Sequence, residues 1–186
     1  MILIGLSGLK RSGKSTVARY LVEQYGFGEV SFAAPMYRAI ATMIGIDIQH
    51  LQDETRKEAD IPWLGRSPRY LLQTLGSEWG RGLVRDDIWI LIALRHIERH
   101  RDMGMPGVIV SDVRFDNEAQ FIISQGGQVW IISRPCRPVN GRDGHASERG
   151  ISPNIPSRGI VNAAGFPTLY KRVDELLDTL QQRAAP

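Results

Sequence analysis

The feature that most constrains this chain is a glycine-rich segment that starts at its eighth residue. Residues 8–15 (GLKRSGKS) match the pattern G-x-x-x-x-G-K-[ST] at every fixed position. The apolar run at residues 2–7 (ILIGLS) precedes this segment and suits a buried strand. After it, residues 16–25 carry apolar side chains at helical spacing, and Gly26 ends the helix. The pattern predicts a strand, a tight turn and a helix, in that order.

A strand, turn and helix of this kind can bind the phosphates of a nucleoside triphosphate. Glycines let the backbone turn so that successive N–H groups point at phosphate oxygens, and the helix that starts near Gly13 adds its positive end. Lys14 can reach the β- and γ-phosphates, and the Ser15 hydroxyl is placed to ligate Mg²⁺. A chance glycine turn is the alternative, which the flanking strand and helix disfavour. Residues 8–15 are called the phosphate loop below.

Short apolar strands alternate with helices along the rest of the chain. We expect strands at residues 30–32, 108–110, 129–132 and 160–161, and helices at residues 35–44, 47–59, 67–79, 86–101, 116–125 and 166–182. This alternation predicts an α/β fold with a parallel sheet between two helical layers, the three-layer sandwich of P-loop NTPases. We expect a single domain, 1–186, with its core at about 1–34, 106–134 and 158–186, a helical insertion at about 35–105 and a long loop at about 135–157.

Composition excludes several other classes of protein. The 186 residues carry a net charge of +3, too small an excess to indicate nucleic-acid binding. Cys136 is the one cysteine, so an internal disulfide and a multi-cysteine zinc site are excluded, and a reducing compartment is favoured. The longest apolar run, residues 88–94, is too short to cross a bilayer, and residues 1–6 lack a basic start. We expect a cytoplasmic protein with no nucleic-acid or membrane partner.

Ligands of parallel α/β sheets bind beyond the carboxyl ends of the strands. The residues expected at those ends are 7–15, 33–35, 112–114 and 133–134, which predicts one common cleft. Asp112 follows an apolar strand, where a carboxylate can hold Mg²⁺ through water or bind a substrate hydroxyl or base. The alternative is a helix cap, for which Asp116 is better placed. Arg114, two residues later, is expected at the same strand end as Asp112. The alternative, with equal support, is that Arg114 is a surface arginine without a role in the site.

The segment at residues 133–158 is unusually rich in proline and arginine. Loops longer than about 12–15 residues in compact domains are usually functional lids or disordered. Phosphoryl transfer needs cations that close over the transferring group and exclude water. Arg134, tethered to a strand end, is therefore the first candidate for this role, and Arg137 and Arg142 are further lid candidates. A plain disordered loop is the alternative.

The helical insertion carries side chains suited to an acceptor nucleotide. Arg38 lies one turn into its first helix, and a later helix carries Arg69, Gln73 and Trp79. Arginine binds phosphate bidentately, glutamine reads a base edge, and tryptophan stacks on a base. Trp79 at a core position is an alternative with equal support. The charged run at residues 53–58 is interpreted as a solvated face, and the histidines at 96 and 100 as part of a basic helix end rather than a metal site.

Several segments together resemble the phage-type deoxynucleoside monophosphate kinases. They are residues 8–16, 31–35, 67–81 (SPRYLLQTLGSEWGR), 110–118 (VSDVRFDNE) and 145–148 (HASE). The resemblance implies a nucleotide-kinase fold with an acceptor-binding region at about 35–105 and a lid at about 135–157. It also implies transfer of the γ-phosphate of ATP to a deoxynucleoside monophosphate, with Mg²⁺. Residues 112–114 (DVR) replace the D-G-[FY]-P-R pattern of adenylate kinases, so adenylate kinase activity is not expected.

The resemblance also assigns roles to single residues. ATP binding is assigned to Lys10, Gly13, Lys14, Ser15 and Thr16, and we expect Arg11 and Ser12 of the same loop to take part. The acceptor is assigned to Arg38, Arg69, Gln73 and Trp79, with Asp112 and Arg114 between the substrates and Arg134 at the start of the lid. We expect Lys14, Asp112 and Arg134 to be catalytic, and Ser15 and Asp112 to be metal ligands. The expected reaction is direct in-line transfer without a covalent enzyme intermediate.

Other readings of the phosphate loop stay open. One is a kinase for another small acceptor, such as dephospho-coenzyme A or phosphomevalonate. A second is a nucleic-acid-coupled NTPase, and a third is a degenerate nucleotide-binding module, which the intact Lys14 and Ser15 disfavour. The expected partner is a deoxynucleoside monophosphate, and a homodimer is left open. If the chain is encoded by a phage, the expected compartment is the host cytoplasm.

Overall fold

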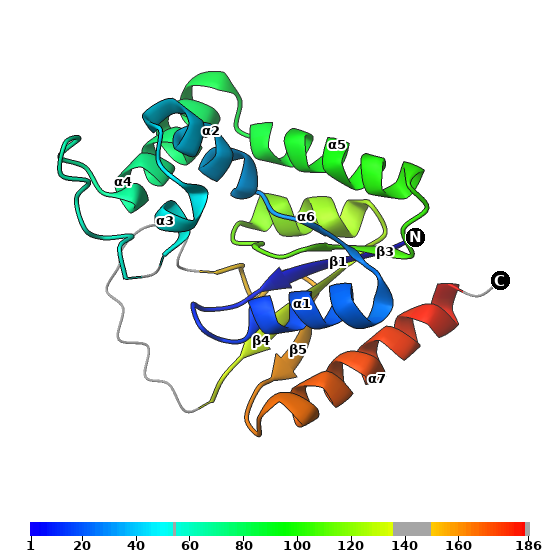
Figure 1. Ribbon diagram of the computed structural model, residues 1–186. Helices are drawn as coiled ribbons and strands as arrows, with labels where there is room; N and C mark the ends of the chain where they lie inside the picture. The colour runs from blue at the N-terminus through cyan, green and yellow to red at the C-terminus, as the bar shows by residue number, and fades with distance from the viewer. Residues whose placement is uncertain (54, 136–149, 185–186) are drawn as a thin grey trace. The chain divides into compact units, whose positions relative to one another are not determined.

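A five-stranded sheet with the order β2-β3-β1-β4-β5 forms the centre of the fold (Figure 1). The computed structural model describes residues 1–53, 55–135 and 150–184. All neighbouring strands pair in parallel. The strands are β1 (Ile2–Ser7), β2 (Gly28–Val30), β3 (Gly107–Val110), β4 (Gln128–Ser133) and β5 (Arg158–Val161). The predicted α/β fold with a parallel sheet is confirmed.

Strand β2 ends earlier than the sequence predicts. Residues 31 and 32 were expected in this strand, but the strand stops at Val30. The Ser31 hydroxyl oxygen accepts hydrogen bonds from the backbone N–H groups of Ala33 (3.2 Å) and Ala34 (3.1 Å). This local turn competes with sheet pairing, so the chain leaves the sheet after Val30 and enters the next helix.

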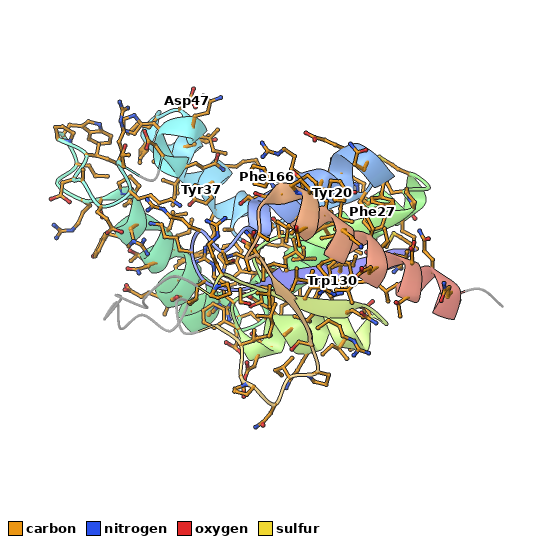
Figure 2. The ribbon with its side chains drawn as sticks, turned by 90° about the horizontal axis from the view of Figure 1, so that it is seen from below. Tyr20, Phe27, Tyr37, Asp47, Trp130 and Phe166 are labelled. Atoms are coloured by element: carbon orange, nitrogen blue, oxygen red, sulfur yellow. The ribbon has the colours of Figure 1, made fainter. Side chains whose placement is uncertain are left out.

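Helices cover both faces of the sheet (Figure 1). One face carries α1 (Lys14–Tyr25) and α7 (Phe166–Ala184), and the other carries α6 (Asp116–Ser124) and the second half of α5 (Ile88–Asp102). The core between the sheet and the α1–α7 layer is apolar and includes Trp130, which is fully buried (Figure 2). This burial explains why the strands read as continuous apolar runs in the sequence.

An aromatic and polar contact joins α1 to α7. The Asp174 carboxylate on α7 accepts hydrogen bonds from the hydroxyls of Tyr20 (2.9 Å) and Tyr25 (2.7 Å) on α1. Tyr20 also stacks on Tyr170, with ring centroids 4.0 Å apart. These hydrogen bonds favour the protonated phenols and raise the pKa of Tyr25. The helix that starts at the phosphate loop is thereby fixed along its length.

The chain forms two compact units. The sheet unit comprises residues 1–30 and 95–186, and the helical unit comprises residues 31–94. The helical unit contains α2 (Ala34–Ile44), α3 (Ile48–Gln52), α4 (Pro68–Gln73), the π-helix η1 (Thr74–Val84) and the first half of α5. From the sequence, the insertion is expected to end at about residue 105. In the structure the helical unit ends at residue 94, inside α5, because α5 is one unbroken helix whose second half belongs to the sheet unit.

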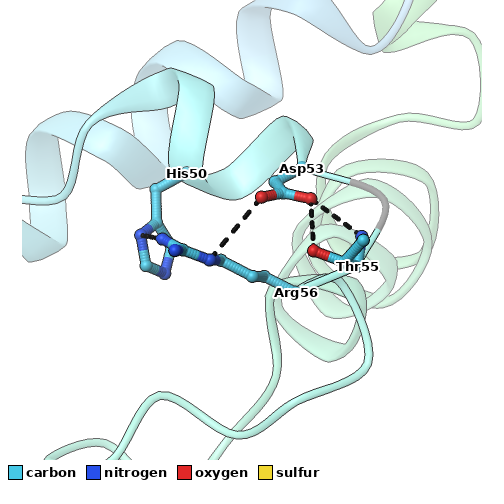
Figure 3. A network of polar contacts seen from close by, with 4 residues as sticks. All are labelled: His50, Asp53, Thr55 and Arg56. Carbon is cyan, nitrogen blue, oxygen red and sulfur yellow. Dashed lines mark hydrogen bonds and ion pairs between the residues drawn. The ribbon is translucent and has the colours of Figure 1, made fainter.

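The helix predicted at residues 47–59 is much shorter than expected. Asp47 caps α3 by accepting a hydrogen bond from the Gln49 N–H (2.7 Å), but the helix ends at Gln52. Beyond it, Asp53 accepts hydrogen bonds from the Thr55 N–H (2.8 Å) and hydroxyl (2.7 Å) (Figure 3). Arg56 pairs with Asp53 (3.5 Å) and contacts Nδ1 of His50 (3.0 Å). These local bonds offer the backbone an alternative to a longer helix.

Candidate active site

The phosphate loop connects β1 to α1 through two glycines in left-handed conformation. Gly8 has φ 134° and Gly13 has φ 117°, values that side chains rarely adopt. A Cβ atom on Gly8 would lie 2.2 Å from the backbone oxygen of Ile132 in β4. The loop therefore turns directly against the carboxyl end of β4. It delivers the chain to Lys14, the first residue of α1, with Gly13 as the helix cap.

Lys14 points into the loop that precedes it. Its ammonium group donates hydrogen bonds to the backbone oxygens of Gly8 (2.6 Å) and Leu9 (2.9 Å). Burial and the nearby Arg114 guanidinium lower the pKa of Lys14 to about 8, while the Asp112 carboxylate acts in the opposite direction. The residues expected at the ends of β1 and β3 thus come together within the sheet unit.

A buried carboxylate fixes the segment that carries Asp112 and Arg114. Glu118 is 2% exposed, and its Oε2 accepts hydrogen bonds from the N–H groups of Arg114 (2.8 Å) and Phe115 (3.1 Å). The Val113 N–H donates to the Leu6 oxygen of β1 (3.0 Å). The sequence analysis did not find Glu118. The sequence signal was weak, because Phe115 at the helix cap lacks the hydroxyl of the capping-box pattern and only the glutamate at the third helical position matches it.

Asn162 is a second residue that the sequence analysis missed. It follows β5 directly, is 3% exposed, and donates a side-chain hydrogen bond to the Ser12 backbone oxygen (2.9 Å). Its own N–H donates to the Ser133 oxygen at the end of β4 (2.7 Å). Its position was the signal, since polar residues at the carboxyl ends of parallel strands face the ligand site.

Most of the other predicted residues of the sheet unit are exposed, and Ser12 is buried. Arg134 is exposed, one residue beyond β4. Lys10, Arg11 and Ser15 are exposed, Thr16 is half-buried, and Ser12 is 4% exposed. The lid candidates Arg137 and Arg142 lie outside the described residues, as does the segment 145–148.

In the helical unit, the predicted acceptor residues have different surroundings. Arg38 is exposed on α2, and Gln73 is half-buried at the end of α4. The Arg69 side chain forms an ion pair with Glu58, and the backbone N–H of Arg69 donates to the backbone oxygen of Lys57 (3.0 Å). Lys57 in turn lies over the Tyr37 ring, 5.8 Å from its centroid. Two members of the charged run at 53–58 thus contact residues elsewhere in the helical unit.

The helix predicted at residues 67–79 changes type partway. Ser67 caps α4 as predicted, accepting a hydrogen bond from the Tyr70 N–H (3.3 Å). From Thr74 the chain continues as a π-helix, so that the Arg85 N–H donates to the Gly80 oxygen (2.9 Å), five residues back. The wider turn buries Gly76 and Gly80 and leaves Trp79 47% exposed. The alternative that Trp79 fills the core is wrong.

A different tryptophan fills that core and explains the two glycines. The Trp89 indole N–H donates to the Gly76 oxygen (2.8 Å). A Cβ atom on Gly80 would lie 2.6 Å from Cζ2 of Trp89, and one on Gly76 would lie 2.8 Å from the Met36 sulfur. The glycines of η1 therefore make room for these side chains, and Trp89 holds the π-helix in place. π-Helical segments occur frequently at functional sites.

Comparison with known proteins identifies the family. A family model described as deoxynucleotide monophosphate kinase matches residues 46–173. The chain belongs to the deoxynucleotide monophosphate kinase family. A protein of Acanthamoeba polyphaga mimivirus, provisionally named a deoxynucleotide monophosphate kinase, is 34% identical over 98% of this chain and 99% of its own length. The deoxynucleoside-5'-monophosphate kinase of Escherichia phage T5 is 25% identical over 87% of this chain and 89% of its own length.

Solved structures share the fold of this kinase at low sequence identity. A protein provisionally titled a kinase, from Chloroflexus aurantiacus, superposes with a TM-score of 0.53 and 14% identity, covering 97% of this chain and 96% of its own. TT1252 from Thermus thermophilus superposes with a TM-score of 0.50 and 18% identity, covering 96% and 97%. Among the residues described, no helix of this kinase is long and apolar enough to span a membrane.

Proposed function

We propose that this chain transfers the γ-phosphate of ATP to a deoxynucleoside monophosphate, giving a deoxynucleoside diphosphate and ADP. The observation that carries the proposal is the cluster of Lys14, Arg114 and Asp112 around a phosphate loop, in a member of the deoxynucleotide monophosphate kinase family. The cluster gives two cations and a carboxylate at one place. Phosphoryl transfer needs cations to offset charge on the phosphates and a carboxylate to hold a metal ion.

The donor phosphates are assigned to the phosphate loop and the first turn of α1. The N–H groups at residues 13–16 start a helix and have no partner within it, so they favour an anion. Lys14 supplies a mobile positive charge, for which phosphate oxygens are stronger partners than the carbonyls of Gly8 and Leu9 that it now contacts. We assign Lys10, Arg11 and Ser12 to the same donor site.

The donor residues fit Mg²⁺. The Ser15 hydroxyl is exposed on the first turn of α1, and the Asp112 carboxylate acts electrostatically on Lys14 of the same loop. Both offer hard oxygen ligands, which Mg²⁺ prefers. Within the described ranges no group of three His, Cys, Asp or Glu side chains forms a metal cage, and this matches the usual magnesium site, where substrate phosphates and waters supply the remaining ligands. When bound, Mg²⁺ would neutralise charge on the phosphates.

The acceptor is assigned to the helical unit. Arg38 and Arg69 would bind its phosphate, Gln73 a base edge, and Trp79 the face of the base. The acceptor phosphate is already anionic near neutral pH, so the in-line attack needs no strong general base. Arg114 and Arg134 would stabilise the charge that spreads over the transferring group. The exposure of Trp79 supports this assignment, because a stacking residue must present its ring.

The test is a coupled assay of ADP release with ATP, Mg²⁺ and each of the four deoxynucleoside monophosphates and four nucleoside monophosphates. We expect release above the acceptor-free rate with at least one deoxynucleoside monophosphate. The Lys14→Ala variant, purified in parallel, controls for contaminating kinases. ADP release that no monophosphate raises above the acceptor-free rate would reject the proposal and favour a plain NTPase.

A further inference from the structure

We infer that Asn162 is a positioning residue that sets the backbone of the phosphate loop and thereby the affinity for the triphosphate of the donor. Asn162 lies on the strand β5 side of the sheet, 150 residues away from the loop in the sequence. The inference rests on the proposed function only in naming ATP as the ligand. Phosphate binding and phosphoryl transfer can be measured separately.

Two hydrogen bonds tie Asn162 to the phosphate loop and to the end of β4. Its side-chain amide donates to the Ser12 oxygen of the phosphate loop (2.9 Å), and its backbone N–H donates to the Ser133 oxygen at the end of β4 (2.7 Å). Arg134 is the next residue after Ser133. One buried asparagine thus connects the loop that would bind phosphate to the strand end that carries a candidate catalytic arginine.

The bond to Ser12 orients a peptide group that faces the ligand. In a planar trans peptide, the C=O of one residue and the N–H of the next point in opposite directions. Because Asn162 holds the Ser12 oxygen, the Gly13 N–H must point away from Asn162. Gly13 is the cap of α1, where free N–H groups bind anions. The amide therefore sets the direction of the first donor of the helix end.

Asn162 also restricts the position of Gly13. A Cβ atom on Gly13 would lie 2.6 Å from the Asn162 side-chain nitrogen, so the amide is packed directly against the backbone at this point. The contact keeps Gly13 in the left-handed conformation, φ 117°, that the tight turn requires. Hydrogen bonding and packing act on the same peptide group.

The polar atoms around this contact argue against a purely structural role. The Asn162 Oδ1 and the Ser12 Oγ are buried and have no hydrogen-bond partner in the part of the chain that the structure describes. A buried polar atom without a partner destabilises a fold, so a residue selected for stability alone would be apolar at this position. Each unsatisfied buried group in a native protein needs an explanation, and a role in binding or catalysis is one such explanation. The asparagine therefore contributes the geometry that it imposes on the loop.

The variant that tests this inference is Asn162→Asp, which keeps the shape of the side chain. An ionised carboxylate cannot donate to the Ser12 oxygen, whereas a protonated carboxyl group can. We expect the affinity for ATP, measured by calorimetry without acceptor, to fall at least about tenfold at pH 8, the effect of losing about one hydrogen bond. At pH 5.5 the ratio of variant to wild-type affinity should recover to within about threefold, because burial raises the pKa of the carboxyl group.

The matched control is Asn154→Asp, the same substitution at an exposed asparagine of the sheet unit. Its affinity for ATP should follow the wild type at both pH values. An affinity of Asn162→Asp equal to the wild type at pH 8 would overturn the inference. A loss that persists at a pH where the carboxyl group is protonated would overturn it too, because the protonated group can again donate to the Ser12 oxygen.

Measuring the binding of tripolyphosphate, apart from any phosphoryl transfer, tests this inference separately from the proposed function. Wild-type chain that binds tripolyphosphate but phosphorylates no monophosphate would refute the proposed function, and the comparison of Asn162→Asp with wild type would still decide the role of Asn162. If the variants do not fold, the wild type decides it by NMR. We expect the side-chain amide signals of Asn162 to shift when tripolyphosphate is added, and unchanged signals at saturation would overturn the inference.

Discussion

The phosphate loop of the sheet unit and the π-helix of the helical unit both depend on a pair of glycines, but for different reasons. In the loop, Gly8 and Gly13 have positive φ, and the backbone itself is the binding surface. In η1, Gly76 and Gly80 have ordinary φ, and they make room for Met36 and Trp89. The first pair shapes a site made of N–H groups. The second pair shapes a helix that presents a side chain, Trp79.

The difference determines how each region should respond to substitution. The phosphate loop binds mainly through backbone N–H groups and few side chains, so removing the one charge at its centre should strongly reduce activity. The π-helix η1 depends on the space left by its glycines, so one added methyl group at such a glycine should strongly reduce stability.

Removing the Lys14 ammonium group should cause the largest loss of activity. Lys14→Ala should lower kcat by at least about a hundredfold, because the ammonium group at the start of α1 would offset charge on the transferring phosphoryl group. The measurement is steady-state ADP release with saturating ATP and acceptor. Lys171→Ala, at an exposed lysine on α7, is the control and should leave kcat unchanged. A kcat for Lys14→Ala within a few fold of wild type would remove the basis of the comparison.

Adding a methyl group should destabilise the chain at Gly80 of the π-helix but much less at Gly82 of the same helix. In Gly80→Ala the new Cβ would lie 2.6 Å from the Trp89 ring and 3.0 Å from the Leu75 oxygen, so we expect a loss of about 1–3 kcal/mol in the free energy of unfolding. The KM for the monophosphate should rise while the KM for ATP stays constant. Gly82→Ala is the matched control, because its Cβ would meet only the Ser77 oxygen at 3.4 Å. Equal losses in both variants, by urea denaturation, would contradict the packing argument.

These two regions also show what the sequence could predict. Residues 8–15 are predictable because the ligand is bound by backbone geometry, which fixes residue types at fixed spacing. The sheet, the two helical layers and the start of α4 at Ser67 follow from apolar periodicity and capping, and the structure confirms them. Asn162 was missed because its partner lies 150 residues away in the sequence.

The π-helix could not be predicted from periodicity for a different reason. Leu71, Leu72, Leu75 and Trp79 recur at α-helical spacing, so the sequence predicts one continuous α-helix and leaves a core position open for Trp79. What changes the helix type is the contact of Gly76 and Gly80 with Met36 and Trp89. That contact depends on tertiary packing, which overrides the local pattern.

The ionisation of Lys14 gives a pH test of the backbone site. Its pKa is lowered to about 8, so the ammonium is fully present below pH 7 and is lost as pH rises through 8. Because kcat/KM reports the free enzyme, kcat/KM for ATP should fall about tenfold between pH 7 and pH 9, with an apparent pKa near 8. The Lys14→Arg variant keeps its charge and should show no such fall, whatever its absolute rate. A wild-type profile that is flat to pH 9.5 would contradict the lowered pKa.

The same shift affects stability with a defined sign. Because the folded pKa of Lys14 lies below its usual value of 10.5, the charged form is disfavoured in the folded chain. The cost is present in full below pH 8 and is relieved as the pH rises from about 8 towards 10.5. Lys14→Met should therefore raise the free energy of unfolding at pH 7 and have less effect at pH 10, by urea denaturation. A larger gain at pH 10 would reverse the assigned sign.

The smallest expected effect concerns a strained residue inside the phosphate loop. Arg11 has φ 61°, the left-handed region, where a side chain costs roughly 1 kcal/mol or more. Arg11→Gly relieves this cost but adds freedom to the unfolded chain, so the net gain in the free energy of unfolding should be about 0.5 kcal/mol. Arg19→Gly is the matched control, the same substitution at an exposed position of α1, and should lose about 1 kcal/mol.

The two Arg11 variants also locate the binding contribution within the loop. Arg11→Lys keeps both the charge and the strain, so it should leave stability unchanged. If the site consists of N–H groups and Lys14 alone, Arg11→Gly should bind ATP as the wild type does. If Arg11 contributes its side chain, as its place in the phosphate loop predicts, Arg11→Gly should lose affinity that Arg11→Lys retains. The strain at this one residue would then be offset by ligand binding, and the contrast between backbone and side-chain sites would hold for the glycines of the loop but not for its arginine.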